Sequence, residues 1–295
     1  MRNEAARLNP GMRQVGHWQM SQCTLPGREQ VAVYEQGPPD GPPLLLFHGS
    51  PGGSLGSWSS IARGLSDTFH LIAIDYPGHG AGPRPAQGFR GEPFSFDTVV
   101  EDAMAVLDAR GIGKVTVLGY SLGGAPALLF ARHHQDRVQG LVLCSTALRF
   151  PRIRSAALLE RIAGTSGSTP RSVTRRSAGI PCRIRGRLGE VLRTNIRAAA
   201  QAELAAEAFD ATSWIREIRV PTAVVISHND SVVATASQEE LAAASGAKRV
   251  LLGGRRGHLA IPFSSAATRK ALRDVCLGMA GEGVSGPRHG GTVLS

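Results

Sequence analysis

A serine between two glycines is the residue best suited to covalent chemistry in this sequence. Residues 119–123 read Gly-Tyr-Ser-Leu-Gly, which matches the GxSxG pattern with Ser121 at its centre. An apolar run at 115–118 precedes the pattern and a helix-like stretch follows it, which predicts a sharp strand-to-helix turn. Such a turn lifts the hydroxyl clear of the sheet, so Ser121 is the candidate nucleophile. Gly119 and Gly123 are expected to let the chain turn tightly.

Acyl transfer also needs N–H donors for the negative charge that develops on the carbonyl oxygen. The N–H of Leu122 lies at a helix N-terminus, where the helix dipole favours an anion. A second donor is expected from the loop after an earlier strand. The apolar run at 44–47 leads into the loop His-Gly-Ser-Pro-Gly-Gly, and the backbone N–H of Ser50 is our candidate. We expect His48 and Gly49 to shape this loop, with His48 holding it by hydrogen bonding rather than acting as the base.

Three motifs, in this order, resemble the α/β-hydrolase superfamily. They are the His-Gly-Ser-Pro-Gly-Gly loop, the stretch Asp-Tyr-Pro-Gly-His-Gly at 75–80 and the Gly-Tyr-Ser-Leu-Gly turn. The resemblance runs from residue 31 to residue 277 and is weak across 148–214. It implies an α/β fold with a mainly parallel eight-stranded sheet flanked by helices, and a lid between strands six and seven. It also implies structural roles for Asp75 and His79.

The resemblance further implies that an acid and then a histidine follow the serine along the chain. The apolar run at 221–227 predicts a late strand, and His228, Asn229 and Asp230 follow it. Some family members carry the acid after the sixth strand instead, but residues 144–146 (Cys-Ser-Thr) offer no carboxylate there. The pair Gly257-His258 matches the Gly-His pattern of the family's last loop. We therefore expect His258 to act as the base and Asp230 to hold its tautomer and orientation.

Alternating strands and helices must bring these residues together. Strand-like segments occur at 30–36, 44–47, 71–74, 115–118, 141–143 and 223–226. Helical periodicity occurs at 98–109, 122–132, 238–244 and 266–277. This alternation predicts a mostly parallel sheet with helices on both faces.

The domain organisation follows from one interval that breaks this alternation. Residues 148–214 contain helix-like pieces and no strand-like run, so we expect them to form a helical cap inserted into the core. The α/β-hydrolase core is then formed by residues 14–147 and 215–280. Residues 1–13 and 281–295 are expected to be flexible tails, because the last segment is rich in glycine and lacks periodicity.

The charge of the chain is concentrated in the predicted cap. The formal net charge is +10, and residues 149–210 hold twelve arginines against five acidic residues. A concentrated positive field attracts anions, which leaves open an anionic or carrier-bound substrate. The alternative is a solvated basic face without a partner. Aromatic residues make up 5% of the chain, too few to predict a surface that stacks nucleic-acid bases.

Several other classes of protein find no support in the sequence. No run of about 18 apolar residues predicts a membrane span. No HExxH motif or Cys/His cluster predicts a metal site, and no Walker or GxGxxG spacing predicts a nucleotide cofactor. Four widely spaced cysteines predict reduced thiols in a cytoplasmic protein. We therefore expect no metal and no cofactor, and the oligomeric state stays open.

The function expected from the sequence is a serine hydrolase that acts on a small-molecule ester, thioester or lactone through an acyl-enzyme. A serine nucleophile argues against the family's haloalkane dehalogenases and epoxide hydrolases, which use aspartate. Two alternatives remain open. One is a thioesterase, acyltransferase or cyclase of secondary metabolism that works on a carrier-bound thioester. The other is a non-hydrolytic, lyase- or isomerase-type member of the fold.

Overall fold

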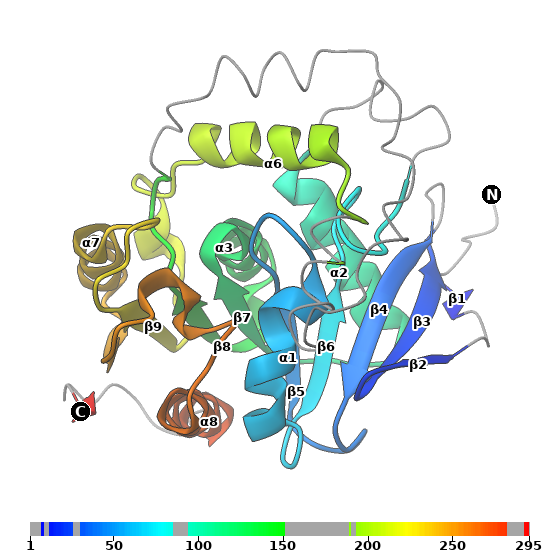
Figure 1. The fold of residues 1–295 in the computed structure, drawn as a ribbon, viewed down its shortest axis with the longest axis horizontal. Coiled ribbons are helices and arrows are strands. Elements are labelled where there is room, and N and C mark those ends of the chain that lie inside the picture. Colours follow the sequence, from blue (N-terminus) through cyan, green and yellow to red (C-terminus); the bar gives the residue numbers. More distant parts are fainter. Residues whose placement is uncertain are drawn as a thin grey trace, which may run out of the picture.

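The centre of the molecule is one mixed β-sheet (Figure 1). The computed structural model describes residues 7–8, 12–25, 30–84, 94–150, 189, 193–281 and 292–294. The strands are β1 (Arg7–Leu8), β2 (Arg13–Val15), β3 (Trp18–Thr24), β4 (Val31–Gln36), β5 (Pro43–Phe47), β6 (His70–Ile74), β7 (Val115–Tyr120), β8 (Val138–Cys144), β9 (Thr222–Ser227), β10 (Lys248–Leu252) and β11 (Thr292–Leu294).

The strand order is β1-β3-β4-β6-β5-β7-β8-β9-β10-β11, and β2 pairs with β3 outside this path. Every neighbouring pair from β6 to β11 is parallel, whereas the pairs that involve β1 to β4 are antiparallel. The prediction of a mainly parallel α/β sheet is confirmed. The sheet has eleven strands rather than eight, because three edge strands of two or three residues extend it. Such short segments carry too little side-chain periodicity to be found in the sequence.

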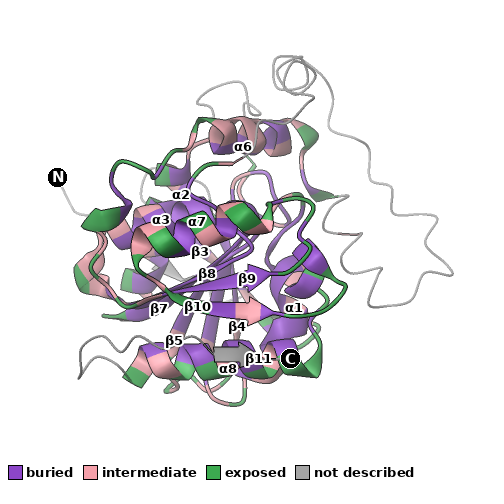
Figure 2. Ribbon diagram, turned by 90° about the vertical axis from the view of Figure 1, so that its left-hand side faces the viewer, coloured by how far each residue is buried: buried purple, intermediate pink, exposed green. Residues whose placement is uncertain are grey.

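Helices cover both faces of the sheet, as the alternation predicts. They are α1 (Ser54–Leu65), α2 (Phe96–Ala109), α3 (Gly124–His133), α6 (Ile196–Ala208), α7 (Thr235–Ser245) and α8 (Ala266–Gly281). One hydrophobic core joins α2, α3 and α7 to one face, and a second joins α1 and α8 to the other. Successive residues of β5 alternate between them: Leu45 and Phe47 face the first core, and Leu44 and Leu46 face the second. Figure 2 shows the resulting layers and the buried central strands.

Helix α1 has no counterpart among the helices predicted from periodicity. Its sequence, Ser-Leu-Gly-Ser-Trp-Ser-Ser-Ile-Ala-Arg-Gly-Leu, is rich in serine and glycine, which are weak helix formers. Tertiary contacts stabilise it instead. Trp58, Ile61 and Leu65 are fully buried, and the Asp75 carboxylate accepts a hydrogen bond of 2.7 Å from the N–H of Ser54 at the helix N-terminus.

Helix α6 lies across the edge of the sheet at which the parallel strands end (Figures 1 and 2). Before the helix, Thr194 Oγ1 donates to Gly52 O at 3.3 Å and Asn195 N donates to Gly78 O at 2.8 Å. After it, Ala211 N donates to Leu148 O at 3.0 Å. The helix is therefore anchored to the loops that follow β5, β6 and β8. It falls within the predicted cap, but most of the first two-thirds of that segment lies outside the described residues.

Two of the short strands fall within the segments predicted as tails. β1 pairs with β3, and β11 pairs in parallel with β10. The flanking residues of both segments lie outside the described part of the chain, so the tail prediction is not tested further. In the ranges that the structure describes, no helix combines the length and the apolar composition that a bilayer span requires.

Candidate active site

Ser121 lies directly after β7, at the start of a 3-10 turn (Ser121–Gly123) that leads into α3. Its φ of 54° is in the left-handed region, which side-chain-bearing residues seldom adopt. The neighbouring glycines allow this geometry. A Cβ on Gly119 would lie 2.6 Å from Gly123 O, and a Cβ on Gly123 would lie 2.2 Å from Phe47 O. The GxSxG pattern is therefore needed here for close packing of backbone against backbone.

The loop after β5 passes beside the serine. A Cβ on Gly49 would lie 2.9 Å from the Tyr120 ring and 3.2 Å from Ser121 Cβ, so only glycine fits. The N–H of Gly49 already donates to Ser57 Oγ at 3.2 Å. Ser50, the next residue of the loop, and Leu122, the residue after the nucleophile, thus remain the two candidate oxyanion donors. Both lie in segments adjoining Ser121.

The structure brings Ser121, His258 and Asp230 into one hydrogen-bonded chain. His258 Nε2 lies 2.9 Å from Ser121 Oγ, and His258 Nδ1 lies 2.9 Å from Asp230 Oδ2. His258 belongs to a short 3-10 helix (Gly257–Ala260) after β10. Gly257 precedes it with a φ of 48°, and a Cβ there would lie 2.5 Å from Asn229 O. This close approach brings the histidine loop against the aspartate loop.

The Asp230 carboxylate is enclosed and fully engaged, with no exposed side-chain surface. Oδ1 accepts hydrogen bonds of 2.9 Å from the N–H groups of Val232 and Val233, and Oδ2 accepts from His258 and from Gln238 Nε2. Burial raises the pKa of Asp230, but the hydrogen bond and charge of His258 and the N–H groups of Val233 and Val232 outweigh it and hold the pKa below the usual aspartate value. Asp230 is therefore ionised at neutral pH.

His48 occupies a different position from a general base. Its ring is fully buried and stacked on Tyr76 at a centroid distance of 3.7 Å. Nδ1 bonds to Gly49 O at 2.9 Å, and Nε2 accepts from Tyr76 N at 3.3 Å. Burial lowers the pKa of His48 to about 4, so the ring is neutral at pH 7 and braces the loop that carries Ser50.

The Asp-Tyr-Pro-Gly-His-Gly stretch at 75–80 also supports the loop after β5, which carries Ser50 and leads into α1. Asp75 Oδ2 accepts from Tyr34 Oη at 3.0 Å and from Ala81 N at 2.8 Å, in addition to the bond that Oδ1 accepts from Ser54. Burial lowers the pKa of His79 to about 3, so this ring is also neutral at pH 7. The bonds of Asp75 and His79 thus run to Tyr34, Ser54, Ala81 and Pro77, and not to Ser121, His258 or Asp230.

Two residues of the site have no signal in the sequence that would have identified them. Tyr120 Oη donates to the backbone carbonyl of His258 at 2.9 Å, which ties the residue before the nucleophile to the histidine loop. Gln238 in α7 donates to Asp230 Oδ2 at 2.9 Å. Tyr120 occupies a variable position of the GxSxG pattern, and Gln238 lies in a polar helical segment, so neither residue type stands out before the chain is folded.

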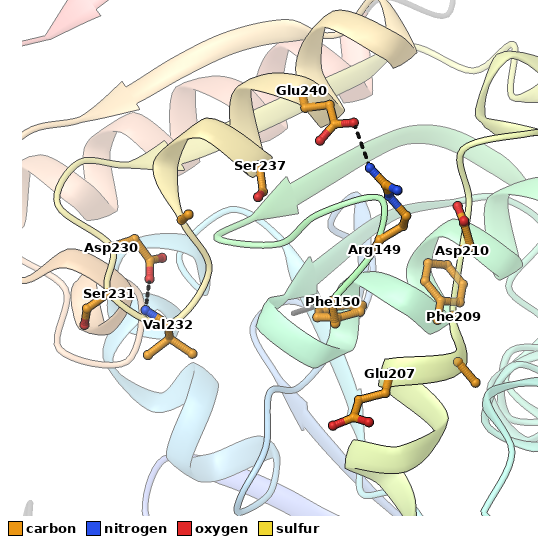
Figure 3. Close-up of a pocket in the computed structure, with 12 residues that line it drawn as sticks. Arg149, Phe150, Glu207, Phe209, Asp210, Asp230, Ser231, Val232, Ser237 and Glu240 are labelled. Atoms are coloured by element: carbon orange, nitrogen blue, oxygen red, sulfur yellow. Dashed lines mark hydrogen bonds and ion pairs between the residues drawn. The ribbon is translucent and has the colours of Figure 1, made fainter. Parts of the chain in front are cut away.

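A cavity of about 590 Å³ adjoins Asp230 (Figure 3). It lies between the end of α6, the loop after β8 and the start of α7. Its charged lining residues are Arg149, Glu207, Asp210, Asp230 and Glu240. Arg149 pairs with Glu240 at 3.3 Å across the cavity. The cavity borders Asp230 and not Ser121, so it lies at the Asp230 end of the hydrogen-bonded chain. In the described ranges, no group of three or more His, Cys, Asp or Glu side chains could hold a metal ion.

Comparison with known proteins shows which proteins this chain is similar to. Residues 42–175 match the family model described as alpha/beta hydrolase fold. A 133-residue segment is 40% identical to 2-hydroxymuconate semialdehyde hydrolase of Pseudomonas putida, covering 42% of this chain and 45% of that protein. A 117-residue segment is 37% identical to a putative 2-succinyl-6-hydroxy-2,4-cyclohexadiene-1-carboxylate synthase of Bacillus subtilis (strain 168), covering 40% of this chain and 41% of that protein.

The similarity in three dimensions extends much further along the chain. The crystal structure of a hydrolase from Pseudomonas aeruginosa PA01 superposes with a TM-score of 0.69 and 25% identity, covering 91% of this chain and all of that one. The sequence matches, in contrast, span less than half the length of the curated relatives. The fold is therefore shared along nearly the whole chain, whereas marked sequence identity is confined to a shorter segment.

Proposed function

This chain belongs to the α/β-hydrolase superfamily, and on that basis we propose that it is a serine hydrolase that cleaves an ester, thioester or lactone carbonyl through a Ser121-His258-Asp230 triad. The observation that carries the proposal is the hydrogen-bonded chain from Ser121 Oγ through both nitrogens of His258 to Asp230, with 2.9 Å at each step. Nucleophile, base and orienting acid are recognised by this geometry rather than by their positions in the sequence.

The proposed mechanism follows from the partners of the two ring nitrogens of His258. Asp230 holds Nδ1–H of His258, so Nε2 carries the lone pair toward Ser121. His258 takes the hydroxyl proton as Ser121 Oγ attacks the substrate carbonyl carbon, and the N–H groups of Leu122 and Ser50 receive the oxyanion. The proton returns from His258 to the leaving group. A water molecule, activated in the same way, then releases the acyl group and restores the free serine.

The surroundings of the triad favour a small, uncharged acyl substrate over an anionic one. The cavity beside Asp230 is lined by the carboxylates of Glu207, Asp210 and Glu240 and by one guanidinium, that of Arg149, which is already paired with Glu240. Such a lining disfavours a negative ligand at this end of the site. The anionic or carrier-bound substrate remains a prediction, because most of the arginine-rich segment 149–197 lies outside the described residues.

A second candidate function is non-hydrolytic chemistry on the same scaffold. One observation favours it: a relative with 37% identity over its aligned segment is named a synthase. In that case the triad would take up and return a proton without forming an acyl-enzyme. Thioesterase and cyclase activities have no such support and remain predictions.

The test is covalent labelling combined with turnover. The purified protein is treated with a fluorophosphonate probe, and its activity is measured on short-chain p-nitrophenyl esters. The same assays are applied to Ser121→Ala, His258→Ala and the matched control Ser245→Ala, whose hydroxyl bonds to Leu241 O at the far end of α7. The proposal expects labelling and turnover in wild type and control, and a loss of at least about 1,000-fold in the two triad variants.

The outcomes separate the two candidates. Labelling and turnover that survive in Ser121→Ala would refute the serine mechanism. A folded wild-type protein that neither reacts with the probe nor cleaves esters would favour the non-hydrolytic candidate. Mass spectrometry of the labelled peptide identifies the modified serine directly.

A further inference from the structure

We propose that Gln238 is a positioning residue for the triad, whose side-chain amide fixes the Asp230 carboxylate in the orientation that directs Oδ2 at His258. This inference rests on the proposed function, because it concerns how the same three residues are held. Gln238 lies in the first turn of α7 and is fully buried. A buried amide is costly unless its groups are satisfied, so its hydrogen bonds can be counted completely.

All the hydrogen-bonding groups of this amide are engaged. Gln238 Oε1 accepts from Ser227 N at 2.9 Å, and Nε2 donates to Asp230 Oδ2 at 2.9 Å and to Val233 O at 2.8 Å. A flipped amide would place Oε1 against a carboxylate and a carbonyl, and would place the NH2 group against the N–H of Ser227. The last residue of β9 therefore sets the orientation of the amide and directs its N–H groups toward the acid.

The consequence for Asp230 is a carboxylate held at both oxygens. Two backbone N–H groups bind Oδ1, while Gln238 and His258 share Oδ2. Hydrogen bonds from neutral donors to a buried carboxylate stabilise its charge and are stronger than neutral pairs. Without the Gln238 N–H, the carboxylate would hold a proton more tightly and would be freer to rotate away from His258. Both changes would weaken the hold of Asp230 on His258 Nδ1.

A purely structural role is the competing explanation, because the same amide also bridges Ser227 and Val233. Loss of those two bonds would destabilise the loop whatever happens to Asp230. Stability alone therefore does not distinguish the two roles. The discriminating measurements are the separation of kcat from KM, the pH profile of turnover and the dependence of the effect on the Asp230 charge.

Two substitutions remove the N–H groups in different ways. Gln238→Met keeps the length of the side chain and removes all its polar groups, and Gln238→Glu keeps its shape and replaces the NH2 group by an oxygen. The matched control is Gln36→Met, at a glutamine of β4 that bonds to Ser66 Oγ at 3.0 Å and lies five strands from β9 in the sheet. Each protein is assayed with p-nitrophenyl acetate from pH 5 to pH 9.

The proposal predicts a specific pattern. Gln238→Met lowers kcat by about tenfold, as expected for one charge-assisted hydrogen bond, with KM changed less than about twofold. The acid limb of its pH profile moves to higher pH, because Asp230 holds a proton more tightly without this donor. Gln238→Glu is most active at the low pH values at which the introduced carboxyl is protonated and can donate to Asp230. It loses activity as the pH rises and that carboxyl ionises. Gln36→Met keeps the wild-type kcat and pH profile.

A second arm does not depend on turnover. Urea unfolding of wild type, Gln238→Met, Asp230→Asn and the double variant forms a double-mutant cycle. Gln238→Met raises the unfolding equilibrium constant by some factor in the wild-type background. If Gln238 positions a charged Asp230, that factor is about tenfold smaller in the Asp230→Asn background. Equal losses in both backgrounds, or an unchanged kcat and acid limb in folded Gln238→Met, would overturn the inference. A wild-type protein without labelling or turnover would contradict the proposed function instead, and the cycle would still test Gln238.

Discussion

The hydroxyl of Tyr120 donates a hydrogen bond of 2.9 Å to the backbone carbonyl of His258, and the two rings lie 5.3 Å apart between centroids. The residue that precedes the candidate nucleophile thus holds the loop of the candidate base. The distance between Ser121 and His258 is therefore set partly by a side chain from the GxSxG turn itself.

Removing this hydroxyl should loosen the histidine loop. We expect Tyr120→Phe to lower kcat about three- to tenfold with little change in KM, and to lower the free energy of unfolding by about 1 kcal/mol, the usual value of one buried hydrogen bond. Tyr34→Phe is the matched control, because it removes a 3.0 Å bond to Asp75 behind the site. A kcat loss of equal size in both variants would show that the effect is not specific to the histidine loop.

The backbone of Ser121 should carry a measurable strain. Its φ of 54° costs a residue with a Cβ about 1–2 kcal/mol relative to glycine, which is partly offset by the greater flexibility of glycine in the unfolded chain. We therefore expect Ser121→Gly to exceed Ser121→Ala in free energy of unfolding by about 0.5–1 kcal/mol. Both variants lack the hydroxyl, so neither should react with a fluorophosphonate. Urea denaturation compares them, and equal stabilities would contradict a strained turn.

The glycines of the chain should differ sharply in their tolerance of a methyl group. A Cβ on Gly123 would lie 2.2 Å from Phe47 O and 2.6 Å from His48 O, so Gly123→Ala must displace backbone. We expect it to cost more than about 3 kcal/mol or to prevent folding. Gly278 of α8 has no atom within 4 Å of its Cβ position apart from the backbone of its own helix and its chain neighbours, and Gly278→Ala should stabilise the protein by about 0.5–1 kcal/mol. Thermal melts of both variants measure these changes. Equal changes in stability for Gly123→Ala and Gly278→Ala would contradict the prediction.

One ion-pair cluster away from the site should make stability depend on pH. Burial raises the pKa of Glu35, but the hydrogen bonds and charges of His70 and Arg110 outweigh it and lower the pKa to about 2. A carboxyl with a lowered pKa in the folded state stabilises the protein above the unfolded pKa near 4.5, and this stabilisation is lost as the pH falls toward 2. Glu35→Gln should cost about 3 kcal/mol at pH 7.

The difference between wild type and Glu35→Gln should therefore shrink as the pH is lowered from 5 to 3, measured by urea unfolding at each pH. Asp136→Asn, at an acidic residue of the surface turn 135–137, is a suitable control. A difference that stays constant with pH would mean that the lost packing, and not the charge of Glu35, accounts for the effect.

The sequence by itself determined the parts of this protein that depend on local patterns. The apolar runs identified the parallel strands from β5 to β9, because a strand buried on both faces needs apolar side chains at nearly every position. Ser121 could be identified because its strained turn demands glycines at fixed spacing on either side. Asp230 and His258 were selected from a resemblance and from their places after predicted strands, and the geometry then put them within 2.9 Å of their partners.

Only the tertiary structure decided how those residues are held. Tyr120, Gln238 and Asp75 act through hydrogen bonds to residues or backbone groups brought close by folding, and a polar side chain in a sequence does not reveal whether it will be buried or what it will meet. Helix α1 forms through the burial of Trp58 and Ile61, although its own sequence favours a helix weakly. The placement of α6 over the strand ends likewise depends on hydrogen bonds to the carbonyl groups of three separate loops, two donated by backbone N–H groups and one by the Thr194 hydroxyl. The sequence does not reveal which carbonyl each donor will meet.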